Sequence, residues 1–291
     1  MILSVASGKG GTGKTTVAVN LAVCAPEPVV LLDCDVEEPN CHLFLGAPLE
    51  TIEQVGIGVP SLDEEACIGC GDCAAICQFQ AVAELGGKPM LFPDLCHGCG
   101  GCMLACPTGA ISEQQSEIGV IERARTGGCT LLHGRLKVGK ALSPPLIKAV
   151  RRCGGAGGLT IVDGPPGTTC SLAAALSGCD LALLVAEPTP FGVHDLGLLL
   201  EGVEQLGLPR AVVVNRAGHR TNLVRELCDS AGVPVLAEIP ESREVARAQA
   251  RGQMASRRIP EIAAIFESMW PAIMGAAREQ NPERDGLNPR S

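Results

Sequence analysis

The chain has 291 residues, of which 46% are hydrophobic, and it carries a formal net charge of −9 at pH 7. This length allows one large domain and a small one, and the negative charge argues against nucleic acid as a partner. No apolar run reaches the roughly 18–20 residues of a membrane-spanning helix, and the first predicted strand leaves no room for a signal peptide. We therefore expect a cytoplasmic protein without membrane association.

Apolar, strand-like runs alternate with helical patterns along most of the chain. The first run, Ile2–Ala6, leads into a glycine-rich loop, and a helix is predicted at Thr15–Val23. Further strands are predicted at Val29–Asp33, Leu159–Asp163, Leu181–Ala186, Ala211–Asn215 and Val233–Ile239. Further helices are predicted at Ser143–Arg152, Asp195–Gln205, Asn222–Ser230, Ser242–Arg251 and Glu261–Arg278. This alternation predicts an α/β fold whose parallel sheet is covered by helices on both faces.

The loop after the first strand reads G-K-G-G-T-G-K-T at residues 8–15. Its glycines allow the backbone to wrap around phosphates and to present N–H donors at a helix N-terminus. Lys14 supplies positive charge to the outer phosphates, and the Thr15 hydroxyl is a predicted ligand of Mg²⁺. We therefore predict that ATP or ADP binds with Mg²⁺ to the following loop residues: Gly8, Lys9, Gly10, Gly11, Thr12, Gly13, Lys14, Thr15 and Thr16.

Residues 61–112 (the cysteine-rich segment) interrupt the alternation of strands and helices. They hold two copies of C-x2-C-x2-C-x3-C, at residues 67–77 and 96–106, within a longer internal repeat. Thiolates at this spacing are typical ligands of a pair of [4Fe–4S] clusters. The alternative, a pair of zinc sites, fits less well, because zinc ribbons use two separated C-x2-C pairs.

In two-cluster ferredoxins, the fourth cysteine of each run binds the other cluster. One cluster is therefore predicted to bind Cys67, Cys70, Cys73 and Cys106. The other is predicted to bind Cys77, Cys96, Cys99 and Cys102. The second run continues into Pro107, whereas the first continues into Gln78, which changes the local backbone without removing a ligand. The other eight cysteines lack paired metal spacing.

The predicted organisation is an ATPase domain made of residues 1–60 and 113–278, an inserted ferredoxin domain at 61–112, and a polar tail at 279–291. Within the larger domain, Ile118–Gly139 alternates enough to predict a β-hairpin. The apolar stripe of Glu261–Arg278 lacks the cationic flanks of a membrane-binding helix, so we expect it to close the core.

Lys9 resembles the additional lysine in the phosphate loop of the deviant Walker A ATPases, which include MinD, ParA, Mrp and the nitrogenase iron protein. The resemblance covers the chain apart from the cysteine-rich segment and the tail. The stretch L-L-D-C-D-V-E-E-P-N-C-H-L-F-L-G at 31–46 is similar to the family's first switch. The stretch I-V-D-G-P-P-G-T-T at 161–169 is similar to its Walker B motif and second switch. V-V-N-R at 213–216 is similar to its adenine motif.

The resemblance implies a role for each matching residue. Lys9 would contact nucleotide phosphate in an ATP-bound homodimer. Asp35 would position or activate the attacking water, with Asp33 at the strand end, and Asp163 would hold Mg²⁺ through water. Gly167 would sense the γ-phosphate. The adenine base would be bound by Asn215, Arg216 and Pro240. For each acid, the alternative is a strand-end carboxylate that caps the next helix.

As a whole, the chain resembles MinD-superfamily ATPases that carry an inserted bacterial-type ferredoxin domain. The implied function is a Mg-ATP-dependent homodimer with two [4Fe–4S] clusters per subunit, which couples ATP to electron exchange with redox protein partners. One alternative is cluster assembly or delivery to an apo-acceptor protein, as in Mrp-type carriers. Another is a redox-sensing positioning switch, although the acidic charge and the C-terminal helix count against it.

Overall fold

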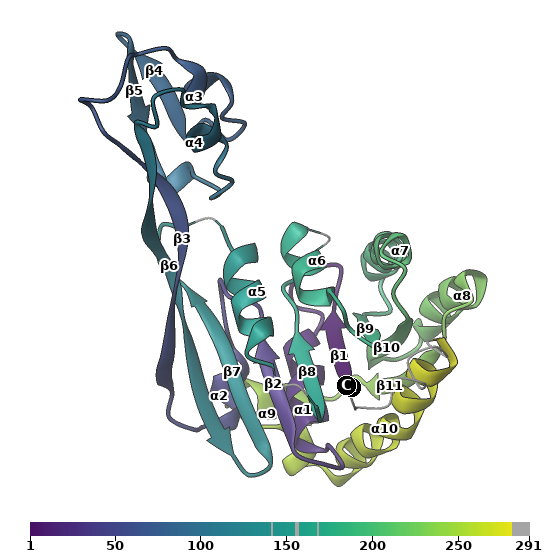
Figure 1. Ribbon diagram of the computed structural model, residues 1–291. Coiled ribbons are helices and arrows are strands. Elements are labelled where there is room, and N and C mark those ends of the chain that lie inside the picture. Colours follow the sequence, from purple (N-terminus) through teal and green to yellow (C-terminus); the bar gives the residue numbers. More distant parts are fainter. Residues whose placement is uncertain (141, 155–156, 168, 281–291) are drawn as a thin grey trace.

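The computed structural model describes residues 1–140, 142–154, 157–167 and 169–280, and these residues build a nine-stranded central sheet (Figure 1). The strand order is β11-β10-β9-β1-β8-β2-β7-β6-β3. The strands of this sheet are β1 (Ile2–Ala6), β2 (Val29–Asp33), β3 (Glu50–Leu62), β6 (Ile111–Thr126), β7 (Cys129–Leu136), β8 (Leu159–Asp163), β9 (Leu181–Ala186), β10 (Arg210–Ala217) and β11 (Val235–Pro240).

The prediction of a parallel sheet is correct for the part of the sheet from β11 to β7, where each neighbouring pair is parallel. Beyond β7 the sheet continues in antiparallel pairing through β6 and β3, which the prediction of the parallel sheet did not include. No strand was predicted at β3. Its sequence contains Gly56, Gly58 and Pro60, which weaken a strand pattern but are tolerated in an edge strand whose outer N–H groups need no partner.

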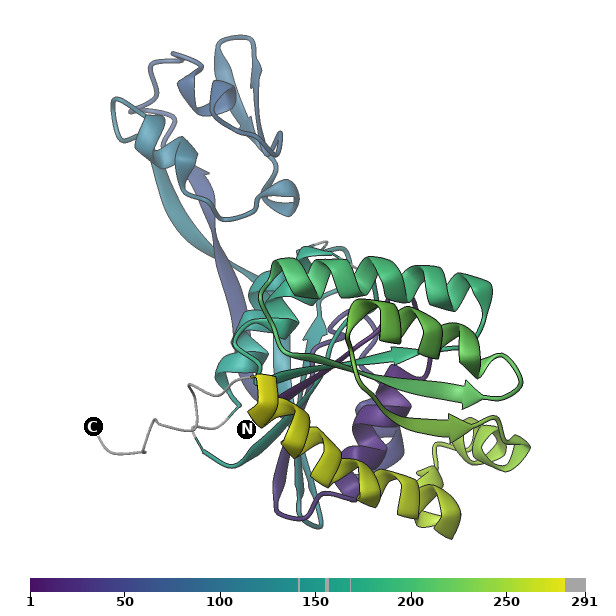
Figure 2. The ribbon, with the colours of Figure 1, turned by 90° about the vertical axis from the view of Figure 1, so that its right-hand side faces the viewer.

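Helices cover both faces of the sheet, as predicted. Figure 2 shows the two layers from the side. The apolar faces of α1 and α10 pack together on one face, while α5, α6, α7 and α8 supply the buried side chains of the other. The α-helices are α1 (Lys14–Val23), α2 (Cys41–Leu45), α3 (Asp72–Ala75), α4 (Gly101–Ala105), α5 (Pro144–Arg152), α6 (Cys170–Leu176), α7 (Pro190–Gln205), α8 (Thr221–Ala231), α9 (Arg243–Ala250) and α10 (Pro260–Gln280).

The predicted helices are confirmed with small shifts at their ends. The largest shift is in α7, which begins at Pro190, earlier than the predicted Asp195. Thr189 caps this helix by accepting a hydrogen bond from the Gly192 N–H, and a proline at the first helical position is favourable because its missing donor is not needed there. The apolar stripe of α10 is buried in the core, and no helix within the described ranges is long and apolar enough to cross a membrane.

A long two-stranded ribbon extends from one end of the sheet. The predicted hairpin is confirmed by β6 and β7, but β6 begins well before Ile118 and pairs with β3 along its length. Beyond the end of β7, residues 56–62 of β3 and 111–117 of β6 pair only with each other (the arm). In Figure 1 the arm carries the cysteine-rich segment away from the helices and the sheet.

The tip of the arm holds the two halves of the internal repeat. The segment contains α3 and α4, a two-stranded sheet of β4 (Val82–Leu85) and β5 (Lys88–Leu91), and a short 3₁₀ turn, η1 (Pro93–Leu95). A second 3₁₀ turn, η2 (Ala255–Arg257), precedes α10. The division into domains stays a prediction. The predicted polar tail begins within α10, and its residues 281–291 lie outside the described part of the chain.

Candidate functional sites

The glycine-rich loop lies between β1 and α1, at the carboxyl edge of the central strands. Gly13 has a left-handed backbone with φ of 88°, and a Cβ atom there would lie 2.2 Å from Nδ2 of Asn215. At Gly8, a Cβ atom would lie 2.6 Å from the main-chain oxygen of Asp195 on α7. Glycine is therefore required at both positions, because the loop passes tightly between β10 and α7.

An open cavity of about 440 Å³ lies along this loop. Its walls come from the loop, the residues after β2, and the side chains of Leu43 and Phe44 on α2. Gln249 on α9 also lines it and donates a hydrogen bond to the Thr16 hydroxyl at 2.9 Å. The predicted residues that line the cavity are Lys9, Gly10, Gly11, Thr12, Gly13, Lys14, Thr15, Thr16, Asp35 and Arg216.

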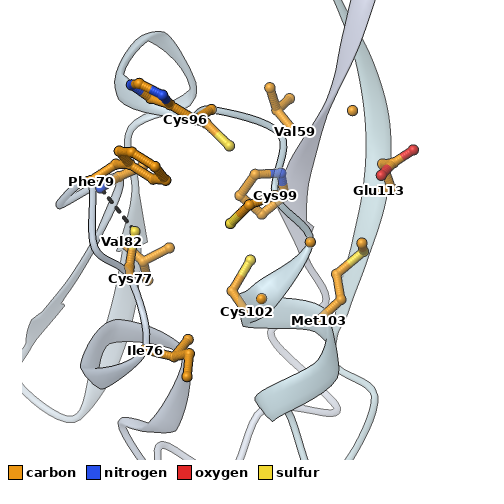
Figure 3. A pocket seen from close by; sticks show the side chains of 16 residues that line it. Val59, Ile76, Cys77, Phe79, Val82, Cys96, Cys99, Cys102, Met103 and Glu113 are labelled. Atoms are coloured by element: carbon orange, nitrogen blue, oxygen red, sulfur yellow. Dashed lines mark hydrogen bonds between the residues drawn. The ribbon is translucent and has the colours of Figure 1, made fainter. Parts of the chain in front are cut away.

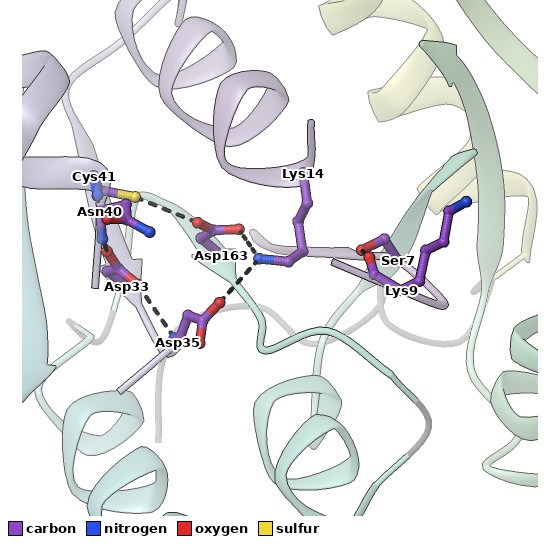
Figure 4. A network of polar contacts seen from close by, with 8 residues as sticks. All are labelled: Ser7, Lys9, Lys14, Asp33, Asp35, Asn40, Cys41 and Asp163. Atoms are coloured by element: carbon purple, nitrogen blue, oxygen red, sulfur yellow. Dashed lines mark hydrogen bonds and ion pairs between the residues drawn. The ribbon is translucent and has the colours of Figure 1, made fainter. Parts of the chain in front are cut away.

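Lys14 lies at the centre of a buried charge network (Figure 4). Its Nζ atom is 3.0 Å from Oδ1 of Asp163 and 3.7 Å from Oδ2 of Asp35. Burial by itself would lower the pKa of Lys14, but the two carboxylates outweigh it and the pKa is raised. Burial raises the pKa of Asp35 to about 6, although Lys14 opposes that shift. The loop lysine and two predicted catalytic acids thus meet at one point, as a phosphate-and-Mg²⁺ site requires.

Asp33 has a capping role in this network. Its Oδ2 accepts hydrogen bonds from the N–H groups of Asn40 and Cys41, each at 2.9 Å, and its Oδ1 accepts one from the Asp35 N–H. Burial and the neighbouring Asp163 raise its pKa to about 7. Asp33 therefore holds the loop that carries Asp35, which corresponds to the capping alternative for a strand-end acid.

A group of possible metal ligands surrounds the same point. One ligand atom each from Asp33, Cys41 and Asp163 lie within 4.8 Å of one another, and all three residues are buried. Cys41 was not predicted as a site residue, and its Sγ lies 3.5 Å from Oδ2 of Asp163. The carboxylates and the Thr15 hydroxyl are the oxygen donors that Mg²⁺ prefers, so the residues present fit the predicted ion.

Glu187 was not predicted, yet it contacts two predicted residues. This buried glutamate at the end of β9 lies 4.0 Å from the Lys9 ammonium and 2.5 Å from Nη1 of Arg216. Arg216 also has a left-handed backbone, with φ of 56°. The one sequence feature that could have marked Glu187 as a site residue is its position directly after a buried strand. In the sheet that strand, β9, lies beside β1, which leads into the phosphate loop.

Of the remaining predicted nucleotide residues, Asn215 and Gly167 contact the loop or the residue before it, and Pro240 does not line the cavity. Asn215 donates a hydrogen bond from Nδ2 to the Thr12 carbonyl at 2.7 Å, and it is buried. The Gly167 N–H donates to the Ser7 carbonyl at 3.1 Å, which joins the second switch to the loop. Pro240 pairs with Ala217 at the ends of β11 and β10, and it is not among the described residues that line the cavity.

The eight motif cysteines fall into two sets of four in the cysteine-rich segment. Figure 3 shows the first cavity, into which sulfur atoms from both halves of the repeat point. This cavity is lined by Cys77, Cys96, Cys99 and Cys102. A second cavity is lined by Cys67, Cys70, Cys73 and Cys106. In each set, three thiols come from one run and the fourth comes from the other run. Four thiols that converge on one cavity in this way match the ligand set of a cubane cluster, which isolated thiols would not.

Backbone groups around these thiols differ between the two halves. The Ala81 N–H donates to Sγ of Cys77 at 3.2 Å, and the Gly98 N–H donates to Sγ of Cys96 at 3.4 Å. Such N–H···S contacts stabilise thiolate ligands and affect the potential of a bound cluster. Gln80 has φ of 56° where the second half of the repeat has Gly109, so the first half adopts the same turn with a side chain.

The first cavity also has an aromatic cover. The exposed His97 ring stacks on Phe79 with a centroid distance of 3.7 Å and an interplanar angle of 6°. In the second half of the repeat, the residue that corresponds to Phe79 is Thr108, whose hydroxyl lies 3.7 Å from Sγ of Cys106. The two cysteine sets are therefore not equivalent in their surroundings.

Comparisons with known proteins agree on the nucleotide-binding part. Residues 3–255 match the family model described as the CobQ/CobB/MinD/ParA nucleotide binding domain. Two uncharacterized proteins of Methanocaldococcus jannaschii are 33% and 34% identical over 223 residues, which cover 75% of this chain and 81% and 79% of those proteins. An iron-sulfur cluster carrier protein of Synechocystis is 50% identical over 48 residues, 16% of this chain and 14% of that protein.

The fold resembles solved structures of MinD. The cell division ATPase MinD of Pyrococcus furiosus aligns with a TM-score of 0.59 at 21% identity, covering 94% of this chain and 98% of that one. MinD of Pyrococcus horikoshii, solved as a complex with Mg-ADP, aligns with a TM-score of 0.57 at 21% identity, covering 98% and 97%. At this level of identity the likeness concerns the fold alone.

Proposed function

This chain belongs to the CobQ/CobB/MinD/ParA nucleotide-binding family, and from that premise we propose that it is a Mg-ATP-dependent, dimeric ATPase that holds two [4Fe–4S] clusters per subunit and couples ATP to electron transfer. The observation that carries the redox part of this proposal is the pair of cavities, each lined by four cysteines from both runs. Bound clusters supply one-electron chemistry at thiolate sites of this kind.

The nucleotide part of the proposal rests on the charge network around Lys14. The loop N–H groups and Lys14 would hold the phosphates, Thr15 would supply an oxygen ligand for Mg²⁺, and Asp163 would hold the ion through water. Asp35 lies on the cavity wall and positions the attacking water. Lys9 lies at the cavity, with its side chain 36% exposed, so it can reach nucleotide bound to the same subunit or to a second one.

Retention of the clusters is favoured over their delivery to another protein. Each cysteine set draws its fourth thiol from the other run, so release of one cluster requires both halves of the segment to open. The alternative, an ATP-dependent carrier that passes clusters to an apo-acceptor protein, is favoured by the short similarity to the Synechocystis cluster carrier. A transfer assay with an apo-ferredoxin separates the two, since only a carrier delivers its clusters.

The decisive experiment measures coupling in both directions under anaerobic conditions. Reduction potentials of the clusters are determined with ADP and with a non-hydrolysable ATP analogue, and ATP hydrolysis is measured with oxidised and with reduced clusters. We expect the potential of at least one cluster to change with the nucleotide. If the rate of ATP hydrolysis is the same with oxidised and reduced clusters, and the reduction potentials are the same with both nucleotides, the coupling proposal is wrong.

A further inference from the structure

One side chain joins the ATPase part of the chain to the cysteine-rich segment. Lys140, which follows β7, places Nζ 2.5 Å from Oδ1 of Asp94 and 3.3 Å from the hydroxyl of Ser116. Asp94 lies in η1, two residues before Cys96, and Ser116 lies on the arm. The Lys140 side chain is only 17% exposed, so this contact is largely covered on the lysine side.

The end of β7, where the connection to α5 begins, contacts the first switch. The Leu136 N–H donates to the carbonyl of Val36, the neighbour of Asp35, at 2.8 Å. The next residue, Lys137, donates its N–H to the carbonyl of Ile118 on β6, also at 2.8 Å. Val36 is buried and lies so close to β7 that a Cβ atom at Gly134 would be 2.7 Å from its Cγ1. A movement of the first switch therefore reaches the base of the arm through tightly packed atoms.

The helix that follows the second switch, α6, contacts this connection at its other end. The hydroxyl of Ser143, the residue before α5, lies 2.8 Å from the hydroxyl of Ser171 on α6. In sequence, α6 begins at Cys170, shortly after Gly167 of the second switch, whose N–H contacts Ser7 before the phosphate loop. Ser143 is 4% exposed. A change in the position of α6 would therefore move Ser143 and the residues packed around it.

We propose that the connection between β7 and α5 transmits the nucleotide state of both switches to the cysteine-rich segment, and that Lys140 is the positioning residue that sets the Cys96 half of that segment. This inference rests on the proposed coupling of ATP to the clusters and names its route. Coupling requires contacts that differ between two states. The end of β7 contacts the first switch, and the described residues of this connection contact α6, the arm and η1.

The nature of the Lys140 contact suits such a role. Asp94 is 75% exposed, so its ion pair with Lys140 adds little to stability and can break and reform readily. The arm is a second physical path, because β6 runs without interruption from the sheet to the segment. Removing the Lys140 charge distinguishes the two routes. The nucleotide response of the cysteine-rich segment is lost if the route runs through Lys140, and it is kept if the route runs through the arm alone.

The test follows amide hydrogen exchange of the cluster-loaded, full-length protein under anaerobic conditions, with ADP or with a non-hydrolysable ATP analogue. In the wild type, exchange of residues 93–105 is expected to differ between the two nucleotides. Lys140→Met and Asp94→Asn are each expected to remove most of that difference. Lys137→Met is the matched control, because Lys137 lies in the same connection and pairs with Glu117 on the arm, 3.8 Å away.

The charge-reversed pair, Lys140→Glu combined with Asp94→Lys, is expected to restore the nucleotide response that either single change removes. Iron content and cluster absorbance equal to those of the wild type show that each variant is folded and loaded. If Lys140→Met and Asp94→Asn keep the full response, the route through Lys140 is wrong and the proposed coupling stands. If the wild type shows protection of the phosphate loop by both nucleotides but no difference at residues 93–105, the route is wrong, and the measurements of potential and hydrolysis decide the proposed coupling separately.

Discussion

The Lys14 ammonium donates a hydrogen bond to Oδ1 of Asp163 across 3.0 Å, and so connects the phosphate loop to the end of β8. Phosphates that bind to the loop compete with this carboxylate, and with that of Asp35, for the same buried cation. Mg²⁺ that accompanies the nucleotide offers the carboxylates a replacement positive charge. The contact therefore links nucleotide binding to the position of both acids.

Lys14→Ala is expected to weaken binding of Mg-ATP by at least about tenfold, because a charge-assisted contact to phosphate is lost in a buried site. Isothermal titration calorimetry measures the effect. Cluster absorbance is expected to stay unchanged, since the cysteine-rich segment lies at the tip of the arm. Lys148→Ala, an exposed position on α5, is the control, and equal affinities for the two variants would contradict the role of Lys14.

Glu187→Gln is expected to promote ATP-dependent dimerisation, because the charged glutamate competes with nucleotide phosphate for Lys9. The ion pair is partly exposed, so the dimer dissociation constant should fall by no more than about fivefold. Sedimentation velocity with an ATP analogue measures it. Lys9→Ala should abolish the dimer in both backgrounds, and Glu204→Gln, which removes the exposed partner of Arg210, should change nothing. A dimer unaffected by Glu187→Gln would show that this glutamate does not restrain Lys9.

Cys70→Ser and Cys99→Ser are each expected to remove one cluster, because they belong to different cavities. Iron content should fall from about eight to about four atoms per chain in either variant, with one set of electron paramagnetic resonance signals remaining. Cys153→Ser, at a cysteine outside both motifs, is the control. Protein that contains zinc and no iron in the wild type would support the zinc alternative instead.

Glu122 is expected to make the base of the arm sensitive to acid. It accepts hydrogen bonds from both Arg135 and His133, and the Arg135 contact is the largest cause that lowers the pKa of Glu122 to about 2 from an ordinary 4.5. The stability that this shift contributes is complete above the unfolded pKa and is lost as the pH falls through the folded pKa. Burial lowers the pKa of His133, against the effect of Glu122.

Glu122→Gln should therefore reduce the free energy of unfolding at pH 7 on the order of 1–3 kcal/mol, and the difference from wild type should shrink as the pH falls from about 5 to about 2. Urea unfolding at several pH values measures both effects. Glu117→Gln, which alters a more exposed pair with Lys137, should have little effect at any pH. If the difference in the free energy of unfolding between Glu122→Gln and wild type grows as the pH falls, the pH dependence assigned to Glu122 has the wrong sign.

Much of the nucleotide site could be predicted because its residues are contiguous. The strand before the loop, the loop glycines and the helix after it are neighbours in sequence, so their spacing alone indicates phosphate binding. Asp163 was predictable for a similar reason, since acids at the carboxyl ends of parallel strands share one edge of the sheet. Glu187 satisfies the same condition, but no local motif marks it, and only the adjacency of β9 and β1 brings it to Lys9.

The sequence by itself determined the α/β architecture, the phosphate loop and the spacing of the eight thiols, because each of these depends on periodicity or spacing over a few residues. The tertiary structure decided that β3 and β6 form an antiparallel arm, and that Lys140 meets Asp94, from which it is separated by 46 positions in the sequence. Contacts of this kind depend on strand order, register and packing. A single sequence leaves these open, because many pairings satisfy the same local pattern.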